Sequence, residues 1–136
     1  MTDLLYSDVE GELRSHVRRL LGAHCAPADL LARIESDAPY DPAVWKTLAG
    51  DLGVPGLAVP ESTGGQGGSW REVAVVSEEL GRSLAGTPFL GSSVLATAIA
   101  IGTEQPALLR ALAAGELTAT LAVPLSTAPG SGRPSA

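Results

Sequence analysis

The stretch GGQGG at residues 64–68 is the first candidate for chemistry, because glycine-rich turns can bring backbone amides close to a phosphate. A dinucleotide-binding fingerprint would need glycine where Trp70 stands, and a P-loop would need a following Lys-Ser or Lys-Thr pair that the sequence lacks. The proline-broken segment before it is also a poor strand. The pattern therefore favours a structural turn, since glycine adopts a positive φ at little cost.

Metal binding has few candidate ligands in this chain. His16, His24 and Cys25 could approach a metal, since the two histidines lie about two helical turns apart and can share one face. A closed zinc site usually needs four ligands, and the chain has one cysteine and two histidines. We therefore expect no metal site.

Acid–base chemistry is also poorly supported. The adjacent acids Glu78 and Glu79 cannot face each other, because neighbouring residues on a helix point roughly 100° apart. One of them is expected to pair with Arg82 on a solvated helix face. Both histidines fall in or near the predicted first helix, so no Ser-His-Asp arrangement can be argued. The sequence predicts no catalytic residue in this chain.

Small residues interrupt an apolar helical pattern at Gly91, Ser92 and Ser93. The helix that would carry them is predicted to begin at Thr87-Pro88 and to run to residue 101. Small side chains either allow a neighbouring helix to approach closely or leave room for a ligand. The sequence alone favours close packing, and both alternatives stay open.

The elements that would position these residues are predicted to be helices. Apolar residues at gaps of three and four indicate an amphipathic helix over about residues 4–22. Asp41-Pro42 is typical of a helix start, and Gly53 is typical of a helix end. Ser69 and Glu72 form a capping-box pattern ahead of an apolar run. Further helices are predicted between Pro27 and Pro39, over 87–101 and over 104–114.

The remaining segments are predicted from their own patterns. Prolines interrupt the apolar stretch 54–60, which we interpret as a buried connector. Residues 116–123 alternate between apolar and polar side chains, a period-two pattern that predicts a strand. A lone strand leaves backbone groups unpaired, so we expect this one to pair with another chain or with a following sheet. The expected core includes Trp45, Leu48, Val73, Leu80 and Leu84.

Composition narrows the class of protein further. The 136 residues carry a net charge of −6 and are 45% hydrophobic, which fits one packed domain. An acidic chain is repelled by nucleic acid and by anionic membranes, so we expect neither as a partner. One cysteine cannot form an internal disulfide, and the N-terminus does not resemble a signal peptide. These features predict a cytoplasmic protein.

Three motifs resemble one known family. They read GLAVPESTGGQGG from Gly56, EELGR ending at Arg82, and LAAGELTATLAVP ending at Pro124. They resemble the N-terminal helical domain of acyl-CoA dehydrogenases, in particular actinobacterial subunits, and the likeness covers roughly residues 4–125. The implied fold class is all-α. About six helices fill residues 1–115, the first strand of a middle β-domain lies at 116–125, and a flexible tail follows at 126–136.

The resemblance implies α,β-dehydrogenation of an acyl-CoA thioester by FAD, which the family binds at a dimer interface. The family's catalytic carboxylate lies in its C-terminal domain, so no residue of this chain takes that role. Val123 matches the flavin-contacting strand, while Pro124 stands where a flavin-facing threonine is usual and offers no backbone donor. The substrate contacts that the resemblance implies lie on the wall of the acyl cavity, at Phe89, Gly91, Ser92 and Ser93.

Two functions stay open at this point. In the first, the chain is the N-terminal part of a FAD-dependent acyl-CoA dehydrogenase subunit that supplies acyl-pocket wall and subunit contacts and is not active alone. In the second, it is a non-catalytic helical interaction module or partner subunit that docks on a related dehydrogenase. We expect homo- or hetero-oligomers with related subunits, and no FAD on this chain alone. Sterol-type and other bulky acyl-CoA thioesters are the substrates of the diverged subunits it resembles.

Overall fold

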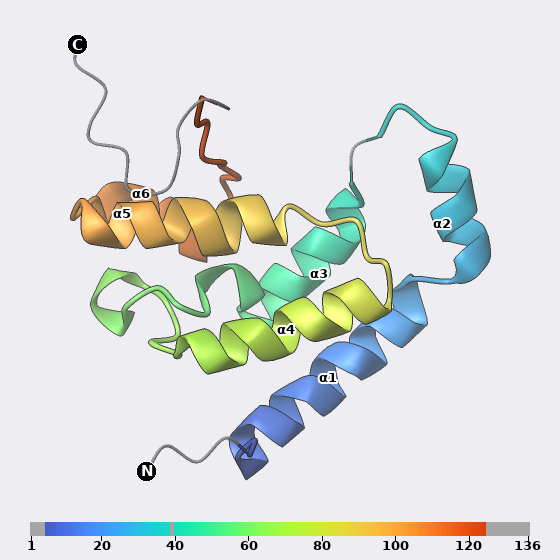
Figure 1. Ribbon diagram of the computed structural model, residues 1–136, viewed down its shortest axis with the longest axis horizontal. Coiled ribbons are helices and arrows are strands. Elements are labelled where there is room, and N and C mark those ends of the chain that lie inside the picture. The colour runs from blue at the N-terminus through green and yellow to red at the C-terminus, as the bar shows by residue number, and fades with distance from the viewer. Residues whose placement is uncertain (1–4, 39, 125–136) are drawn as a thin grey trace.

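The computed structural model describes residues 5–38 and 40–124, and all regular elements in this part of the chain are helices (Figure 1). The helix α1 runs alongside α4, while α5 and α6 pack against each other and α6 contacts η1. The elements in order are α1 Asp8–His24, α2 Pro27–Ile34, α3 Pro42–Leu52, the 3-10 turns η1 Val54–Gly56 and η2 Glu61–Thr63, α4 Trp70–Arg82, the π-helix η3 Leu90–Ala96, α5 Thr97–Gly102 and α6 Pro106–Ala113.

Side-chain caps fix the start of three helices. Ser7 and Glu10 form a capping box at α1, which therefore begins at Asp8 and not near residue 4. The Asp41 carboxylate accepts from the first free amides of α3 at 2.9 and 3.2 Å. Ser69 caps α4, and Glu72 accepts from the Ser69 amide at 2.8 Å. The predicted caps at Asp41 and Ser69 are confirmed.

The main core joins α1, α3, α4 and the connector. Trp45, Leu48, Val73 and Leu80 are all buried in it, as predicted. Leu84 is the exception among the predicted core residues, with 75% of its surface exposed. The helix α4 ends at Arg82, and Leu84 adopts a φ of 49°, so the helical spacing that placed it on the apolar face no longer applies.

The connector after α3 is buried, as its composition predicts. Gly53 ends α3 in the left-handed conformation with a φ of 59°. The chain then folds into η1, whose residues Val54 to Gly56 are all buried, and Val59 is fully buried as well. A second, smaller core packs Val59 against η3, α5 and α6 through Ala96, Ala100, Leu109 and Leu112.

The later helices differ from the prediction at their starts. The helix predicted over residues 87–101 begins at Leu90, runs as a π-helix to Ala96 and continues as α5 to Gly102. The helix predicted from residue 104 begins at Pro106, because Glu104 has a φ of 52° and cannot belong to a helix. No simple spacing rule in the sequence signals the π-helix.

The strand predicted over residues 116–123 is not formed within the described chain, and its pairing with another chain or with a following sheet stays a prediction. Residues 116–124 have no strand, and the described part of the chain offers them no strand to pair with. An isolated extended segment cannot build a ladder, so its alternating pattern has no sheet to join here. Residues 125–136, which include the predicted tail and the last residue of the predicted strand, lie outside the described residues. In the described ranges, no helix is long and apolar enough to cross a membrane.

Candidate functional site

The predicted substrate-wall residues lie at the start of the π-helix. Phe89 is 3% exposed and belongs to the main core, where it joins Val76 and Leu80. Ser92 and Ser93 are buried as well, and Gly91 is half-buried. The structure therefore brings the four predicted residues together in one turn, and π-helical turns occur frequently at functional sites.

Two of these residues make room for the C-terminal segment. A Cβ on Gly91 would lie 3.1 Å from Thr120 Oγ1 and 3.5 Å from the Ala119 carbonyl. Ser92 Oγ accepts a hydrogen bond of 3.3 Å from the Ala119 amide. The small side chains at Gly91 and Ser92 thus allow close packing, as the sequence favours, although the neighbour is the 119–120 segment and not a helix.

Ser93 is different, because its buried hydroxyl has no hydrogen-bond partner among the described residues. The Thr97 hydroxyl, by contrast, is satisfied, because it donates to the Ser92 carbonyl at 3.0 Å. A buried hydroxyl without a partner costs free energy, so Ser93 is the polar group of this turn that a bound ligand or water could satisfy.

An apolar hollow lies beside Phe89. It has a volume of about 320 Å³ and is walled by the C-terminal half of α4 and the start of the π-helix. Leu90 is 66% exposed at its mouth, and Leu84 is 75% exposed. Small side chains at Ser77, Gly81, Ala85 and Thr87 leave the space open between the large ones. Such a wall can bind an apolar group and exclude water.

The glycine stretch 64–68 is a structural turn, as the sequence favours. Gly64 and Gly67 have φ values of 88° and 64°. The amides of residues 65, 66, 67 and 68 donate to carbonyls of residues 60, 56, 59 and 57, at 2.8 to 3.2 Å. These amides are already hydrogen-bonded to the connector, so they are not free to bind a phosphate.

Glu79 is the most heavily paired charged group of the described chain, and the sequence prediction of a solvated acid face is wrong for it. Its side chain is 1% exposed and receives Arg14 at 3.1 Å, Arg18 at 2.6 and 2.9 Å, and Arg82 at 3.3 Å. The predicted pairing with Arg82 is present. The hydrogen bonds from Arg18 outweigh burial and lower the pKa of Glu79 to about 2.

Two more carboxylates extend this network along α1. Glu78 binds Arg14 at 2.6 Å and accepts from the Tyr6 hydroxyl at 2.9 Å, and both contacts lower its pKa. The buried Glu10 receives Arg71 Nε at 2.5 Å and the Ser7 amide at 2.6 Å, which together lower the pKa of Glu10 to about 2. These pairs hold α1 against α4, and their role is structural.

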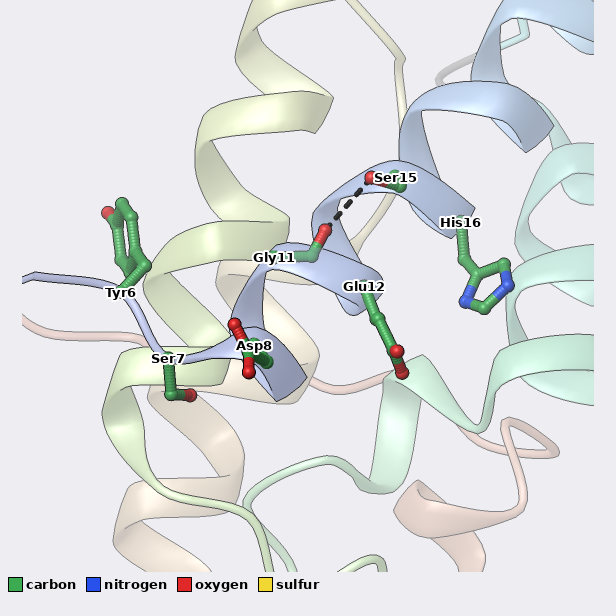
Figure 2. A pocket seen from close by; sticks show the side chains of 7 residues that line it. All are labelled: Tyr6, Ser7, Asp8, Gly11, Glu12, Ser15 and His16. Atoms are coloured by element: carbon green, nitrogen blue, oxygen red, sulfur yellow. Dashed lines mark hydrogen bonds between the residues drawn. The ribbon is translucent and has the colours of Figure 1, made fainter.

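The two histidines and the cysteine do not form a metal site. The described residues contain no group of three or more His, Cys, Asp or Glu side chains that could hold a metal ion. His16 borders a broad hollow of about 740 Å³ over the first turns of α1 (Figure 2). All of its lining residues come from residues 6–16, so no other described element closes over it. Burial raises the pKa of the Cys25 thiol, which makes it a poor nucleophile at neutral pH.

The predicted flavin contact at Val123 stays a prediction. Val123 is 60% exposed, and the following Pro124 offers neither a hydroxyl nor a backbone donor. The glycine amides that could cradle a phosphate are already used within the chain. We therefore assign no flavin contact and no redox step to the described residues.

The geometry defines a helical domain that carries an apolar hollow and a π-helix but no catalytic constellation among its described residues. Residues 7–116 match the family described as "Acyl-CoA dehydrogenase, N-terminal domain". Since this match spans most of the chain, the protein belongs to the acyl-CoA dehydrogenase family and carries its N-terminal domain. The resemblance in the sequence motifs is thereby confirmed.

Curated relatives come from mycobacteria and are longer than this chain. "Acyl-CoA dehydrogenase IpdE2" of Mycolicibacterium smegmatis is 39% identical over 95 residues, which cover 69% of this chain and 30% of that protein. "Acyl-CoA dehydrogenase FadE27" of Mycobacterium tuberculosis is 32% identical over 94 residues, covering 69% of this chain and 25% of that protein. The chain thus spans less than a third of the length of these relatives.

Solved structures show the same arrangement of helices. The ChsE4-ChsE5 complex from Mycobacterium tuberculosis superposes with a TM-score of 0.81 at 26% identity, over 94% of this chain and 36% of that chain. A variant of the Tcur3481-Tcur3483 steroid ACAD superposes with a TM-score of 0.72 at 31% identity, over 82% of this chain and 31% of that chain. The helical fold of an acyl-CoA dehydrogenase N-terminal domain is therefore confirmed.

Proposed function

We propose that this chain is the N-terminal part of a FAD-dependent acyl-CoA dehydrogenase subunit that acts in α,β-dehydrogenation of an acyl-CoA thioester. Its part is to supply one wall of the acyl pocket and contacts to related subunits. The observation that carries the proposal is the apolar hollow of about 320 Å³ beside Phe89, in a chain of this family.

In this proposal, the residues of the wall have different roles. Phe89 and Leu90 line the hollow and offer apolar surface to the acyl group, whereas Gly91, Ser92 and Ser93 do not line it. Gly91 and Ser92 seat the 119–120 segment and so hold the wall in shape. Apolar burial and exclusion of water are what such a wall contributes to the reaction, while the chemistry belongs to other parts of the enzyme.

The substrate that we propose is a bulky acyl-CoA thioester, of the kind carried by a sterol side chain or ring system. The support is the row of small side chains that widens the hollow, together with the steroid ACAD among the similar structures. We place the protein in the cytoplasm, and the single half-buried cysteine supports a reducing compartment.

The test is to co-express the chain with a related acyl-CoA dehydrogenase subunit, purify the complex, and measure flavin absorption and acyl-CoA oxidation. We expect no flavin on the chain alone. In the complex we expect Leu90→Gln to raise KM for a steroid-type acyl-CoA thioester while the flavin content stays unchanged. The matched control is Val9→Gln, since Val9 is equally exposed on α1 at 67% and lies outside the hollow.

Two results would contradict the proposal. One is a purified chain that is yellow with one flavin per polypeptide, because the proposal places the flavin in the complete enzyme and not on this chain alone. The other is a Leu90→Gln complex with the same KM as the Val9→Gln control, because the hollow would then not contact the substrate.

A second function has its own support. Both similar structures are named for pairs of proteins, ChsE4-ChsE5 and Tcur3481-Tcur3483, which favours assembly with a related subunit. The chain would then serve as a non-catalytic helical interaction module that completes the partner. A complex that oxidises the thioester at the same rate with wild-type chain and Leu90→Gln would favour this function over the first.

A further inference from the structure

The apolar hollow beside Phe89, the Phe89 hollow, has a neighbour on the other side of Leu84. This second space, the α2 hollow, has a volume of about 290 Å³ and lies between α2 and the loop after α4. Leu30, Arg33 and Ile34 line it from α2, and Leu84 and Gly86 line it from the loop. Since Leu84 lines both hollows, the two spaces meet at this side chain.

Leu84 stands at a backbone position where glycine is usual. The amides of residues 84 and 85 donate to the carbonyls of residues 81 and 80 at 3.1 and 3.0 Å, which is the Schellman pattern at the end of α4. Leu84 takes the left-handed place in this pattern with a φ of 49°, which costs a leucine free energy. Its side chain is 75% exposed, so packing within the domain does not offset that cost. Backbone strain of this kind clusters at functional sites.

Of the described residues that line the α2 hollow, only Arg33 is charged, and its charge is neutralised. Its guanidinium pairs with Asp41 and donates to the Tyr40 carbonyl at 3.4 Å. Its aliphatic stem lies toward Gly86, since a Cβ built on Gly86 would lie 4.0 Å from Arg33 Cδ. The Ser36 hydroxyl is also satisfied, because it donates to the Arg33 carbonyl at 2.8 Å. The hollow therefore accepts an apolar group without leaving a charge unpaired.

The Phe89 hollow alone is small for a bulky acyl group. Its volume of about 320 Å³ is at the low end of the roughly 300–1,000 Å³ that ligand pockets occupy. A short acyl group fits in this space alone, whereas a fused-ring acyl group that enters beside Phe89 needs further apolar space. The α2 hollow offers that space directly beyond Leu84.

We propose that the α2 hollow receives the far end of a bulky acyl group whose near part lies in the Phe89 hollow. Leu84, the wall that the two hollows share, then determines how large an acyl group the chain accepts. The inference rests on the proposed function, because it extends the same acyl wall. It assigns the preference for bulky over short acyl groups to apolar burial at the loop after α4 and at α2.

Glycine-to-leucine variants test the two hollows separately in the complex, by kcat/KM for a steroid-type acyl-CoA thioester and for butyryl-CoA. Gly86→Leu fills the α2 hollow without a clash, because the atoms closest to a Cβ there lie 3.9 and 4.0 Å away. We expect it to lower the ratio of the two kcat/KM values, steroid-type over butyryl, about tenfold. Gly81→Leu fills only the Phe89 hollow and is expected to lower both values.

The matched control is Gly50→Leu. Gly50 is exposed on α3, has no atom within 4 Å of a Cβ and lines neither hollow. We expect both kcat/KM values to stay as in the wild type.

Leu84→Gly tests the shared wall. Glycine adopts the left-handed conformation without strain, so we expect the variant chain to unfold at a higher urea concentration than the wild type. The variant also removes the side chain between the hollows and is expected to raise the ratio of kcat/KM, steroid-type over butyryl, severalfold. A gain in stability with an unchanged ratio would mean that Leu84 does not select the acyl group.

Photolabelling gives a readout that does not depend on turnover. A steroid-type acyl-CoA thioester with a diazirine on the ring farthest from the thioester is irradiated in the complex, and the labelled peptides are mapped by mass spectrometry. We expect label on residues 30–38, and none there in Gly86→Leu.

Two kinds of failure are distinguishable. Label only on other segments, or an unchanged ratio in Gly86→Leu while Gly81→Leu lowers both kcat/KM values, would overturn the inference and leave the proposed function standing. Unchanged values for both thioesters in Gly81→Leu would contradict the proposed function, and the inference with it.

Discussion

The helices α1 and α2 are neighbours in the chain, both are amphipathic, and they end up in opposite environments. On α1, Val17 and Leu21 are fully buried, and Arg14 and Arg18 reach the buried Glu79 of α4. On α2 no residue is buried, and its one arginine pairs at the edge with Asp41. An apolar stripe therefore does not decide whether a helix is packed. Here the packed helix is the one whose arginines have a buried carboxylate partner, Glu79 on α4.

The difference between α1 and α2 is testable with one leucine from each. Leu21→Ala removes a side chain with 0% exposure, and such a change costs about 2–5 kcal/mol in the free energy of unfolding. Leu31→Ala removes a side chain that is 65% exposed and is expected to cost no more than about 0.5 kcal/mol. Urea denaturation of the two variants measures both values. Equal costs would show that α2 is packed in solution.

The second prediction concerns the charges that hold α1. Glu79→Gln removes the buried carboxylate shared by Arg14, Arg18 and Arg82 and is expected to cost roughly 3 kcal/mol, since loss of one buried partner is strongly destabilising. The neighbouring Glu78→Gln is the control, because Glu78 is half exposed, and we expect a loss below about 1 kcal/mol. Denaturation midpoints of the two variants would coincide only if the Glu79 pairs contribute nothing.

The third prediction concerns acid. The pKa values of Glu79 and Glu10 are lowered from 4.5 to about 2 in the folded state, so the unfolded chain binds more protons between those values. The stability that these groups provide is complete above pH 4.5 and is lost as the pH falls toward 2. We expect Glu79→Gln to flatten part of this decline, measured by urea denaturation across that range. An unchanged slope would contradict the low pKa of Glu79.

The smallest expected effect concerns the helix starts. Ser7 caps α1, so Ser7→Ala is expected to cost about 1 kcal/mol. The corresponding position of α2 is Ala26, which has no side-chain bond to offer. Ala26→Ser is expected to gain local stability of a few tenths of a kcal/mol, seen as slower amide exchange in α2. If amide exchange in α2 does not slow, the stability of this helix is limited by its exposed apolar side and not by its N-terminal cap.

Local signals predicted much of the fold, because caps and helix stops act within a few residues. Asp41, Gly53 and Ser69 mark helix ends in both the sequence and the structure. The π-helix start, the exposed Leu84 and the unformed strand were not predicted. Each depends on a backbone conformation or on a partner strand that side-chain spacing does not encode.

The candidate site was predictable in its position but not in its contacts. Phe89 lines the apolar hollow, while residues 91–93 do not, and the substrate contacts that the resemblance implies for all four stay a prediction. The contact of Gly91 with residues 119–120 could not be predicted, because it joins segments far apart in the sequence. Glu79 was missed for the same reason, since Arg18 lies 61 residues before it. The sequence signal that could have indicated a carboxylate partner is the pair Arg14 and Arg18, which lie one turn apart on α1.

The glycine turn at 64–68 has a consequence for how this domain can vary. Four successive amides pair with four carbonyls of the connector, and a Cβ on Gly65 would lie 2.0 Å from the Val59 carbonyl oxygen. One inserted or deleted residue would shift every one of these pairs at once. The segment should therefore keep a constant length across related chains, while its outward side chains change. Insertions and deletions should occur in other loops, such as the one between α2 and α3.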